Sequence, residues 1–471
     1  MDFTKQYIDG AWVPSASQTY IDVENPATKT VFAKVPAGNA ADVDAAAKAA
    51  AKAFPAWEAT PPKTRVELMQ KMLSYFQSIE DDVVQAVVSE LGAPVTFARA
   101  NHVRYQYERI ESYMDLTLRA PFVEYLPKST VYRRPLGVIG CITPWNYPLG
   151  QIVQKVIPAI LAGCTVVFKP SQHTPLTAYY LADAFDHAGF PKGVFNLVAG
   201  RGSEIGNALC DHPLINMISF TGSTEAGSGV AQRALAGLKR ISMELGGKSP
   251  CVLLKQDNYE SGIRSCFNSL FLNAGQTCTA LSRLLIPRSD KGKIETLIKQ
   301  ILPEYIVGDP TKAETKIGPL SSQHQYDTVK GYIQKGIDGG ARILAGGLPD
   351  APDAGYYVRP TIFADVTNDM AIAQEEIFGP VLCVIPYDTV EEAVKIANDT
   401  PYGLNAAVWG PKTLALDVGR RILAGNVYIN DGPRDVEAPF GGFKESGIGR
   451  EGGLDGILEF TEPQALFDHG N

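Results

Sequence analysis

Between Thr165 and Glu244, short apolar runs alternate with segments of helical pattern, and few folds accommodate such an alternation. The pattern predicts strands at Thr165–Phe168, Val194–Val198 and Met217–Phe220, and helices at 174–189, Glu204–Cys210 and Thr224–Leu235. Thr174 and Pro175 are the predicted N-cap and first-turn proline of the first of these helices. Because the predicted strands are apolar along nearly their whole length, both faces of their sheet must be covered. We therefore predict parallel strands with helices on both sides.

A second alternating region runs from Pro250 to about Phe440, so a chain of 471 residues divides into at least two domains. Its predicted strands are Cys251–Leu254, Leu284–Ile286, Val381–Ile385 and Val427–Ile429. Tyr125–Tyr132 and the last dozen residues fit neither domain and favour a strand-rich protrusion. Ala40–Ala53 is Ala-rich and predicts a helix with Asn39 as its N-cap. The natural interpretation is two α/β domains with an active site between them.

The formal charge of −8 argues against nucleic acid or an anionic membrane as the main partner. The first six residues lack the basic segment and apolar core of a signal peptide. The longest apolar stretch, Val156–Phe168, is about half a membrane span and contains Pro158. We expect a cytoplasmic protein that binds neither nucleic acid nor membrane.

The seven cysteines are odd in number and show no C-x-x-C spacing, which fits neither a disulfide framework nor a zinc site. We expect no metal. Six of them lie among apolar neighbours and are typical of small core residues. Cys278 differs, because it follows Gly275-Gln276-Thr277 in a polar context. A buried structural thiol and a nucleophile both remain open for Cys278 on this evidence.

Ligands of parallel α/β sheets bind beyond the carboxyl ends of the strands. Three such segments are polar or glycine-rich, namely Lys169–Gln172, Gly200–Gly202 and Thr221–Thr224. In the last, a strand gives way to a helix whose free N–H groups suit a pyrophosphate. An ordinary strand-to-helix turn is the alternative.

Two other glycine patterns are misleading. Gly447–Gly452 matches G-x-G-x-x-G, but no buried strand precedes it, so we do not assign it to a cofactor. Gly246–Ser249 resembles the end of a P-loop, yet Ser242 stands where the leading glycine belongs and Pro250 follows directly. We therefore exclude a nucleotide triphosphatase.

Two further residues are candidates for catalysis beside a cysteine. Glu244 precedes two glycines and is a candidate base, although a lone glutamate is usually solvated. Asn146 lies between two prolines and two aromatic residues, a rigid setting for an amide that meets a developing oxyanion. A turn asparagine is the alternative. No histidine has a convincing partner, and there is no G-x-S-x-G serine motif.

Seven motifs occur in a fixed order. They are Pro144-Trp145-Asn146-Tyr147-Pro148, Phe168-Lys169-Pro170-Ser171, Phe220-Thr221-Gly222-Ser223-Thr224, Glu244-Leu245-Gly246-Gly247-Lys248-Ser249-Pro250, Gly275-Gln276-Thr277-Cys278, Glu375-Glu376-Ile377-Phe378-Gly379-Pro380 and Pro439-Phe440-Gly441-Gly442-Phe443-Lys444-Glu445-Ser446-Gly447. This order resembles the aldehyde dehydrogenase superfamily, and the resemblance covers nearly the whole chain.

The resemblance implies two doubly wound, Rossmann-like α/β domains with a small β oligomerisation arm. Residues 1–119 and 136–245 would form the cofactor-binding domain and residues 246–444 the catalytic domain. Residues 120–135 and 445–471 would form the arm, which pairs subunits into a dimer or tetramer.

The resemblance also implies roles for single residues. Cys278 would be the nucleophile, Asn146 the oxyanion donor and Glu244 the base. Residues that would bind NAD and/or NADP are Trp145, Lys169, Gln172, Gly202, Gly222, Ser223, Leu245, Glu376 and Phe378. Lys155 and Glu451 match positions that relay protons in some relatives.

The implied reaction is oxidation of an aldehyde to the carboxylic acid, through a thiohemiacetal and then an acyl-thioester that water hydrolyses. Alternatives are a semialdehyde-specific or coenzyme-A-acylating enzyme, or a non-catalytic binding protein on the same scaffold. Gln172 stands where many NAD-preferring relatives have glutamate, so we expect NADP to be accepted. The resemblance places Gln151 and Gln154 on the helix that lines the substrate tunnel, and the loop Asp431–Ala438 at its mouth. With Arg434, Asp435 and Glu437 in that loop, it implies a tunnel more polar than that of fatty- or aromatic-aldehyde enzymes.

Overall fold

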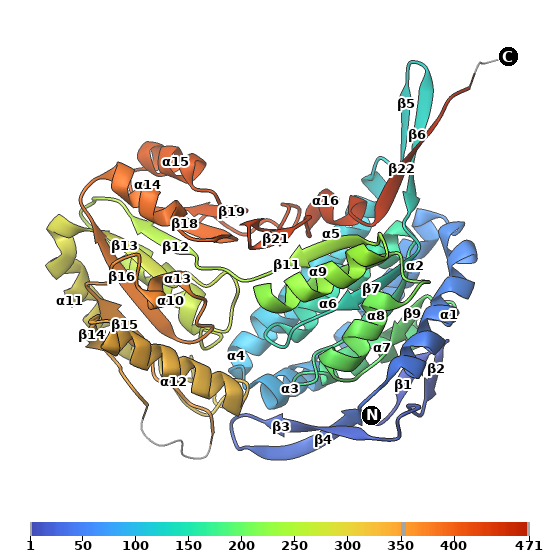
Figure 1. The fold of residues 1–471 in the computed structure, drawn as a ribbon, viewed down its shortest axis with the longest axis horizontal. Coiled ribbons are helices and arrows are strands. Elements are labelled where there is room, and N and C mark those ends of the chain that lie inside the picture. The colour runs from blue at the N-terminus through green and yellow to red at the C-terminus, as the bar shows by residue number, and fades with distance from the viewer. Residues whose placement is uncertain (1, 350–354, 469–471) are drawn as a thin grey trace.

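A computed structural model describes residues 2–349 and 355–468, which form two α/β lobes and a projecting arm (Figure 1). The first sheet has the order β2 (Ala11–Val13), β1 (Gln6–Ile8), β9 (Phe195–Leu197), β8 (Thr165–Lys169), β7 (Val138–Ile142), β10 (Met217–Thr221), β11 (Arg240–Glu244) and β21 (Gly447–Ile448). From β9 to β11 every neighbouring pair is parallel. The parallel sheet predicted from the apolar runs is confirmed.

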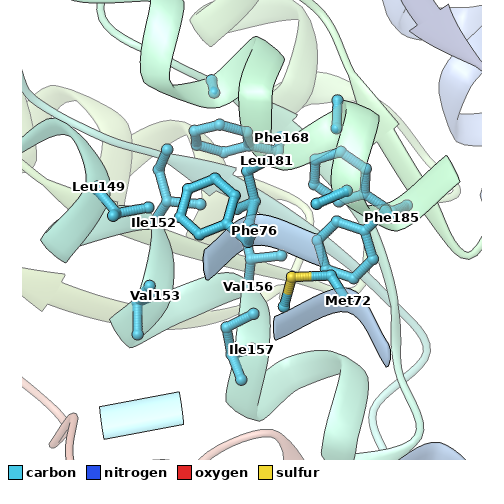
Figure 2. Packing of buried hydrophobic residues seen from close by; sticks show 14 of the residues in the cluster. Met72, Phe76, Leu149, Ile152, Val153, Val156, Ile157, Phe168, Leu181 and Phe185 are labelled. Atoms are coloured by element: carbon cyan, nitrogen blue, oxygen red, sulfur yellow. The ribbon is translucent and has the colours of Figure 1, made fainter. Parts of the chain in front are cut away.

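Helices cover both faces of this sheet. Successive side chains of a strand point to opposite faces, so apolar strands need a helical layer on each side. The helices are α1 (Ala40–Glu58), α2 (Pro62–Ser78), α3 (Glu80–Leu91), α5 (Tyr105–Arg119), α6 (Pro148–Ala162), α7 (Leu176–His187), α8 (Asn207–Asp211) and α9 (Thr224–Ala236). On β8, Val166 and Phe168 belong to the core cluster shared with α2, α6 and α7, whereas Val167 belongs to the cluster shared with α1 and α8. Figure 2 shows the first of these clusters, with Phe76 of α2 beside Val156 of α6.

The second sheet has the order β14 (Arg342–Ala345), β15 (Thr361–Ala364), β16 (Val381–Tyr387), β13 (Arg283–Pro287), β12 (Pro250–Leu253), β18 (Asn405–Trp409) and β19 (Asn426–Ile429). Only β14 runs antiparallel to its neighbour within the described residues. Its helices are α10 (Glu260–Phe271), α11 (Lys291–Ile301), α12 (Gln323–Asp338), α13 (Ala371–Gln374), α14 (Val390–Asn398) and α15 (Lys412–Arg421). All four strands predicted here are confirmed.

The projecting arm is an antiparallel sheet of β5 (Val123–Leu126), β6 (Ser129–Pro135) and β22 (Thr461–Leu466) (Figure 1). The tail predicted for the arm, 445–471, divides in the structure. Its first part returns to the first lobe, because β21 pairs with β11 and α16 (Gly453–Leu458) packs on α5 and α6. Within the described residues, β22 is the part of the tail that pairs with the arm.

The remaining elements are short. They are β3 (Tyr20–Asn25), β4 (Thr30–Pro36), α4 (Val95–Phe97), β17 (Tyr402–Gly403), β20 (Phe443–Lys444), the π-helical turns 98–104 and 202–206, and the 3₁₀ turns 288–290 and 302–304. The predicted helix 204–210 is therefore a π turn followed by α8. None of the described helices is long and apolar enough to cross a membrane.

Helix starts follow the predicted chemistry in one case and depart from it in another. Asn39 caps α1 in a reciprocal capping box with Asp42, as predicted. Thr174 does not cap the next predicted helix, because its hydroxyl donates to the Trp145 carbonyl at 2.9 Å. Instead Glu90 of α3 accepts the N–H groups of Leu176 (2.7 Å) and Thr177 (3.4 Å), so a tertiary contact replaces the local cap of α7.

Candidate active site

Cys278 is the cysteine that burial singles out. The other six cysteines are buried and Cys278 is half-buried, and all seven are free thiols. Cys278 also lines a cavity of about 680 Å³ between the lobes. The prediction that six cysteines are core residues is confirmed, and the polar setting of Cys278 corresponds to a cavity wall.

The segment between β11 and β12 places this cysteine beside the first sheet. Glu244 is the last residue of β11, and Pro250 begins β12 of the second sheet. A side chain on Gly246 would meet the Glu376 carboxylate (2.7 Å), and one on Gly247 would collide with the Cys278 carbonyl oxygen. The two glycines therefore allow the segment 245–249 to approach both Glu376 and the loop of Cys278 closely.

The loop that carries Cys278 is held by close backbone contacts. Gly275 has a φ of +77°, and a side chain there would collide with the Gly379 backbone. The Gln276 side chain accepts the N–H of Ser321 at 2.8 Å. The loop therefore takes a fixed shape before β13.

Asn146 lies beside this loop and is 2% exposed. Its amide donates to the Gln276 carbonyl at 3.1 Å, which leaves a second N–H of the same group. Asn273 donates both to the Asn146 carbonyl (3.0 Å) and to the Gln276 carbonyl (3.1 Å). The sequence missed Asn273, which ties the asparagine to the cysteine loop, because no local pattern marks it.

Glu244 is buried, and neither carboxylate oxygen has a hydrogen-bond partner among the described residues. Burial raises its pKa well above the ordinary value, and the nearby charge of Glu451 raises it further, while Lys155 opposes this. An unpartnered buried carboxyl is costly and is a mark of function.

Burial also raises the pKa of the Cys278 thiol to about 12, and the carboxylates of Glu376 and Glu244 add to the effect. The backbone N–H groups of Thr279 and Cys278 act in the opposite direction. The thiol is therefore protonated at neutral pH, and attack requires a base.

Lys155 and Glu451, whose charges act on the pKa of Glu244, form a buried ion pair. Gln154 donates to the other oxygen of the Glu451 carboxylate at 2.7 Å. Gln151 and Gln154 both line the cavity, as the sequence predicts for the tunnel. Asn146 and Glu244 lie outside its described lining, and Asn146 contacts the cysteine loop through the Gln276 carbonyl.

The strand order of the first sheet places several predicted cofactor residues along the edge formed by the carboxyl ends of its strands. Lys169 ends β8, and Ser223 caps α9 directly beyond β10, accepting the Ala226 N–H at 3.2 Å. Strands β8 and β10 flank β7, so these residues lie on both sides of the point where the strand order reverses. The backbone N–H of Gly222 is bound to the Glu244 carbonyl at 3.1 Å.

The donors at this edge suit a dinucleotide. The Lys169 ammonium is buried and donates to the Pro170 carbonyl at 2.8 Å, so its other protons are available for ribose hydroxyls. Gln172 is half-buried, while Gly202 is exposed and open where a side chain would lie. The residues present fit NAD or NADP.

The other four predicted cofactor residues are Trp145, Leu245, Glu376 and Phe378. Trp145 and Phe378 pack edge to face with centroids 5.4 Å apart, and Phe378 adopts a φ of +57°. Glu376 accepts the Gly247 N–H at 3.1 Å, and burial raises its pKa to about 7. Leu245 donates its N–H to the Ser446 carbonyl at 2.9 Å.

Ser446 is a second residue that the sequence missed. Its hydroxyl donates to the Gly246 carbonyl at 2.7 Å and accepts the Gly403 N–H at 2.9 Å. It therefore fixes the segment between the two sheets. The G-x-G-x-x-G match Gly447–Gly452 begins in edge strand β21 and not at a phosphate site, consistent with its rejection from sequence.

Comparison with known proteins agrees with this geometry. Residues 12–466 match the aldehyde dehydrogenase family. A Staphylococcus saprophyticus protein named as an aldehyde dehydrogenase is 43% identical over 473 residues, covering 100% of both chains. Among solved structures, a mutant of aldehyde dehydrogenase C from Pseudomonas syringae, complexed with NAD+ and octanal, is 44% identical with a TM-score of 0.97, over 99% of this chain and 96% of that one. An NAD+ complex of a Mycobacterium tuberculosis aldehyde dehydrogenase is 40% identical with a TM-score of 0.97, over 99% and 98%. This chain belongs to the aldehyde dehydrogenase family.

Proposed function

We propose that this NAD(P)-dependent aldehyde dehydrogenase forms its thioester on Cys278, with Asn146 and Glu244 as partners. The observation that carries this proposal is the arrangement of three groups around the loop of Cys278. The half-buried Cys278 lines the cavity, and the Asn146 amide donates to the Gln276 carbonyl of the same loop. The Glu244 carboxyl is buried without a partner, and its charge acts on the Cys278 thiol.

In the first step the Cys278 sulfur attacks the aldehyde carbon, and its proton passes to a base. Negative charge develops on the aldehyde oxygen, where the free N–H of the Asn146 amide donates. Such a donor is worth about 3–4 kcal/mol in the transition state. Bound NAD or NADP supplies a hydride acceptor.

In the last step Glu244 removes a proton from water, which hydrolyses the acyl-thioester and frees Cys278. Lys155 and Glu451 form an ion pair, and the charges of both residues act on the pKa of Glu244. We assign these two residues to proton transfer away from the carboxyl.

We assign the predicted cofactor residues to three parts of the dinucleotide. Lys169 and Gln172 would bind the adenosine ribose, and Glu376 would bind the nicotinamide ribose. The pyrophosphate would be bound by Gly202, Gly222 and Ser223, and the cleft would be bordered by Trp145, Leu245 and Phe378.

A glutamate in place of Gln172 would repel the 2′-phosphate of NADP, and this repulsion would lower the affinity for NADP relative to NAD by about 5- to 150-fold. Gln172→Glu should therefore raise the KM for NADP selectively and leave kcat with NAD nearly unchanged. Wild-type selectivity for NAD beyond about a thousandfold would show that pocket shape decides instead.

The arm supports association of subunits into a dimer or tetramer. Tyr125 is 82% exposed at its tip, and Val123 and Leu126 are exposed beside it. A cytoplasmic location is supported by the seven free thiols, because oxidising compartments favour disulfides.

The product of turnover with an aldehyde and NAD tests the hydrolytic function. Mass spectrometry should find the carboxylic acid, in equal amount to NADH, with or without added coenzyme A. Accumulation of an acyl-coenzyme A instead would favour the acylating alternative, and absence of NADH with every aldehyde would favour the non-catalytic one.

A further inference from the structure

Two arginines are the cationic side chains in the described lining of the catalytic cavity: Arg109, from α5, and Arg434, from the loop after β19. Both guanidinium groups lie over one ring, that of Tyr105. Their carbon atoms are 4.8 Å and 5.7 Å from its centroid. Two separate elements thus bring positive charge to one place on the cavity wall, and we name Arg109 and Arg434 the arginine pair.

Neither guanidinium of the arginine pair has a carboxylate oxygen within ion-pair distance in residues 2–349 and 355–468. Arg109 donates to the Gln106 side chain at 3.3 Å. Arg119, on the same helix, is paired with Asp115 (2.6 Å) and with Glu437 (2.9 Å). Like charges that gather without an anion repel each other, so the arginine pair is an arrangement that a negatively charged ligand would stabilise.

Two carboxylates also line the cavity, but each is bound within its own surroundings. Asp431 accepts the Ser265 hydroxyl at 3.1 Å, and Asp435 accepts the Glu437 N–H at 2.9 Å. Both aspartates are exposed, as is Arg434, whereas Arg109 is half-buried, so solvent screens the charges of the aspartates and of Arg434 more than that of Arg109.

The charges of the arginine pair also act on the pKa values of two tyrosines that line the cavity, Tyr147 and Tyr428. Burial raises the pKa of Tyr147 and of Tyr428, and the charges of Arg434 and Arg109 oppose the rise at both. Cys278 also acts on Tyr147, whose hydroxyl contacts Thr277 at 3.1 Å. Tyr147, which contacts Thr277 beside Cys278, therefore lies within electrostatic range of both arginines.

We propose that the arginine pair binds the carboxylate of an aldehyde substrate that carries this group at the end opposite its carbonyl. The inference rests on the proposed role of Cys278, which would take the aldehyde carbon at the other end. A guanidinium holds a carboxylate through two parallel hydrogen bonds, and Tyr105 orients both forks. Gln151 and Gln154 give the intervening wall polar side chains.

The test compares two aldehydes of equal length, 5-oxopentanoate and pentanal. The wild type should have the higher kcat/KM with 5-oxopentanoate. Arg109→Gln combined with Arg434→Gln should lower that value about 10- to 100-fold and change the value for pentanal by less than about threefold. Arg288→Gln is the matched control, because Arg288 is paired with Asp388 (2.8 Å) on the second lobe and lies outside the cavity lining.

A second readout does not depend on turnover of a carboxylated substrate. Glutarate should inhibit pentanal oxidation competitively in the wild type and lose this effect in the double glutamine variant. Equal loss of activity with both aldehydes, or a wild type that prefers pentanal and ignores glutarate, would overturn the anion site while leaving aldehyde oxidation intact. No NADH from these or any other aldehydes would overturn the proposed function as well.

If the double glutamine variant does not fold, Arg109→Lys and Arg434→Lys keep the charge and remove the two-pronged geometry. Each should then lower kcat/KM for 5-oxopentanoate while pentanal is spared. Unchanged kinetics with 5-oxopentanoate in both folded lysine variants would contradict carboxylate binding through the guanidinium forks.

Discussion

Glu244 acts as a base only after it loses its own proton, and its burial makes that loss pH-dependent. Because burial and Glu451 raise its pKa, the fraction of ionised Glu244 grows as pH rises. We therefore predict that deacylation accelerates with pH in the wild type. In Glu244→Gln the steady-state rate should be about 100-fold lower or more, with no such rise.

Rapid mixing of Glu244→Gln with aldehyde and NAD should still give a burst of NADH near one per active site. The burst arises because thioester formation precedes hydrolysis. Loss of both the burst and the steady state would assign Glu244 to deprotonating Cys278 instead.

Single residues show where sequence patterns suffice and where they fail. The polar context of Cys278 distinguishes it from six core cysteines, and burial agrees. By contrast, Asn273 and Ser446 act through contacts with segments remote in sequence. Such contacts depend on packing, which spacing along the chain does not reveal.

Among the elements, α7 depends on a residue from another helix. Its N-terminal N–H groups bind Glu90, which is 1% exposed, so Glu90→Ala would leave them buried without an acceptor. We predict a loss of about 1–2 kcal/mol in the free energy of unfolding, measured by urea denaturation.

The pH dependence of Glu90 has a definite sign. Burial raises its pKa from 4.5 to about 8. Its contribution to stability is therefore complete below 4.5 and decreases as pH rises towards 8. Glu90→Gln still accepts an N–H bond and does not ionise, so its stability relative to wild type should improve over this range. A constant difference would show that the carboxyl is ionised in the folded state throughout.

Strand order was predictable only in part. Apolar runs gave the parallel strands of both sheets, and strand ends correctly marked Lys169 and Thr221–Thr224 as one edge of the first sheet. In the second sheet the site lies at the amino-terminal ends, since Cys278 precedes β13 and Glu376 precedes β16. The rule that ligands bind beyond the carboxyl ends of parallel strands holds for one sheet and does not predict a site that lies between two sheets.

For the whole molecule, the projecting arm predicts self-association (Figure 1). Light scattering should give a dimer or tetramer for the wild type. Tyr125→Asp with Leu126→Asp should shift it towards monomer, because each places a charge on an exposed apolar edge. Leu238→Asp, at a residue 92% exposed outside the arm, should not. A monomeric wild type, or dissociation by Leu238→Asp alone, would contradict this role of the arm.

Covalent catalysis at Cys278 is tested by measuring the NADH production of the variant Cys278→Ser. A hydroxyl is a far weaker nucleophile than a thiolate, so kcat should fall by more than about 100-fold. Binding of NAD, followed by quenching of protein fluorescence, should persist and show that the variant is folded. Cys383→Ser, in the core of the second lobe, should change stability more than turnover. If Cys278→Ser kept more than about a tenth of wild-type kcat, the thioester mechanism proposed for this chain would be wrong.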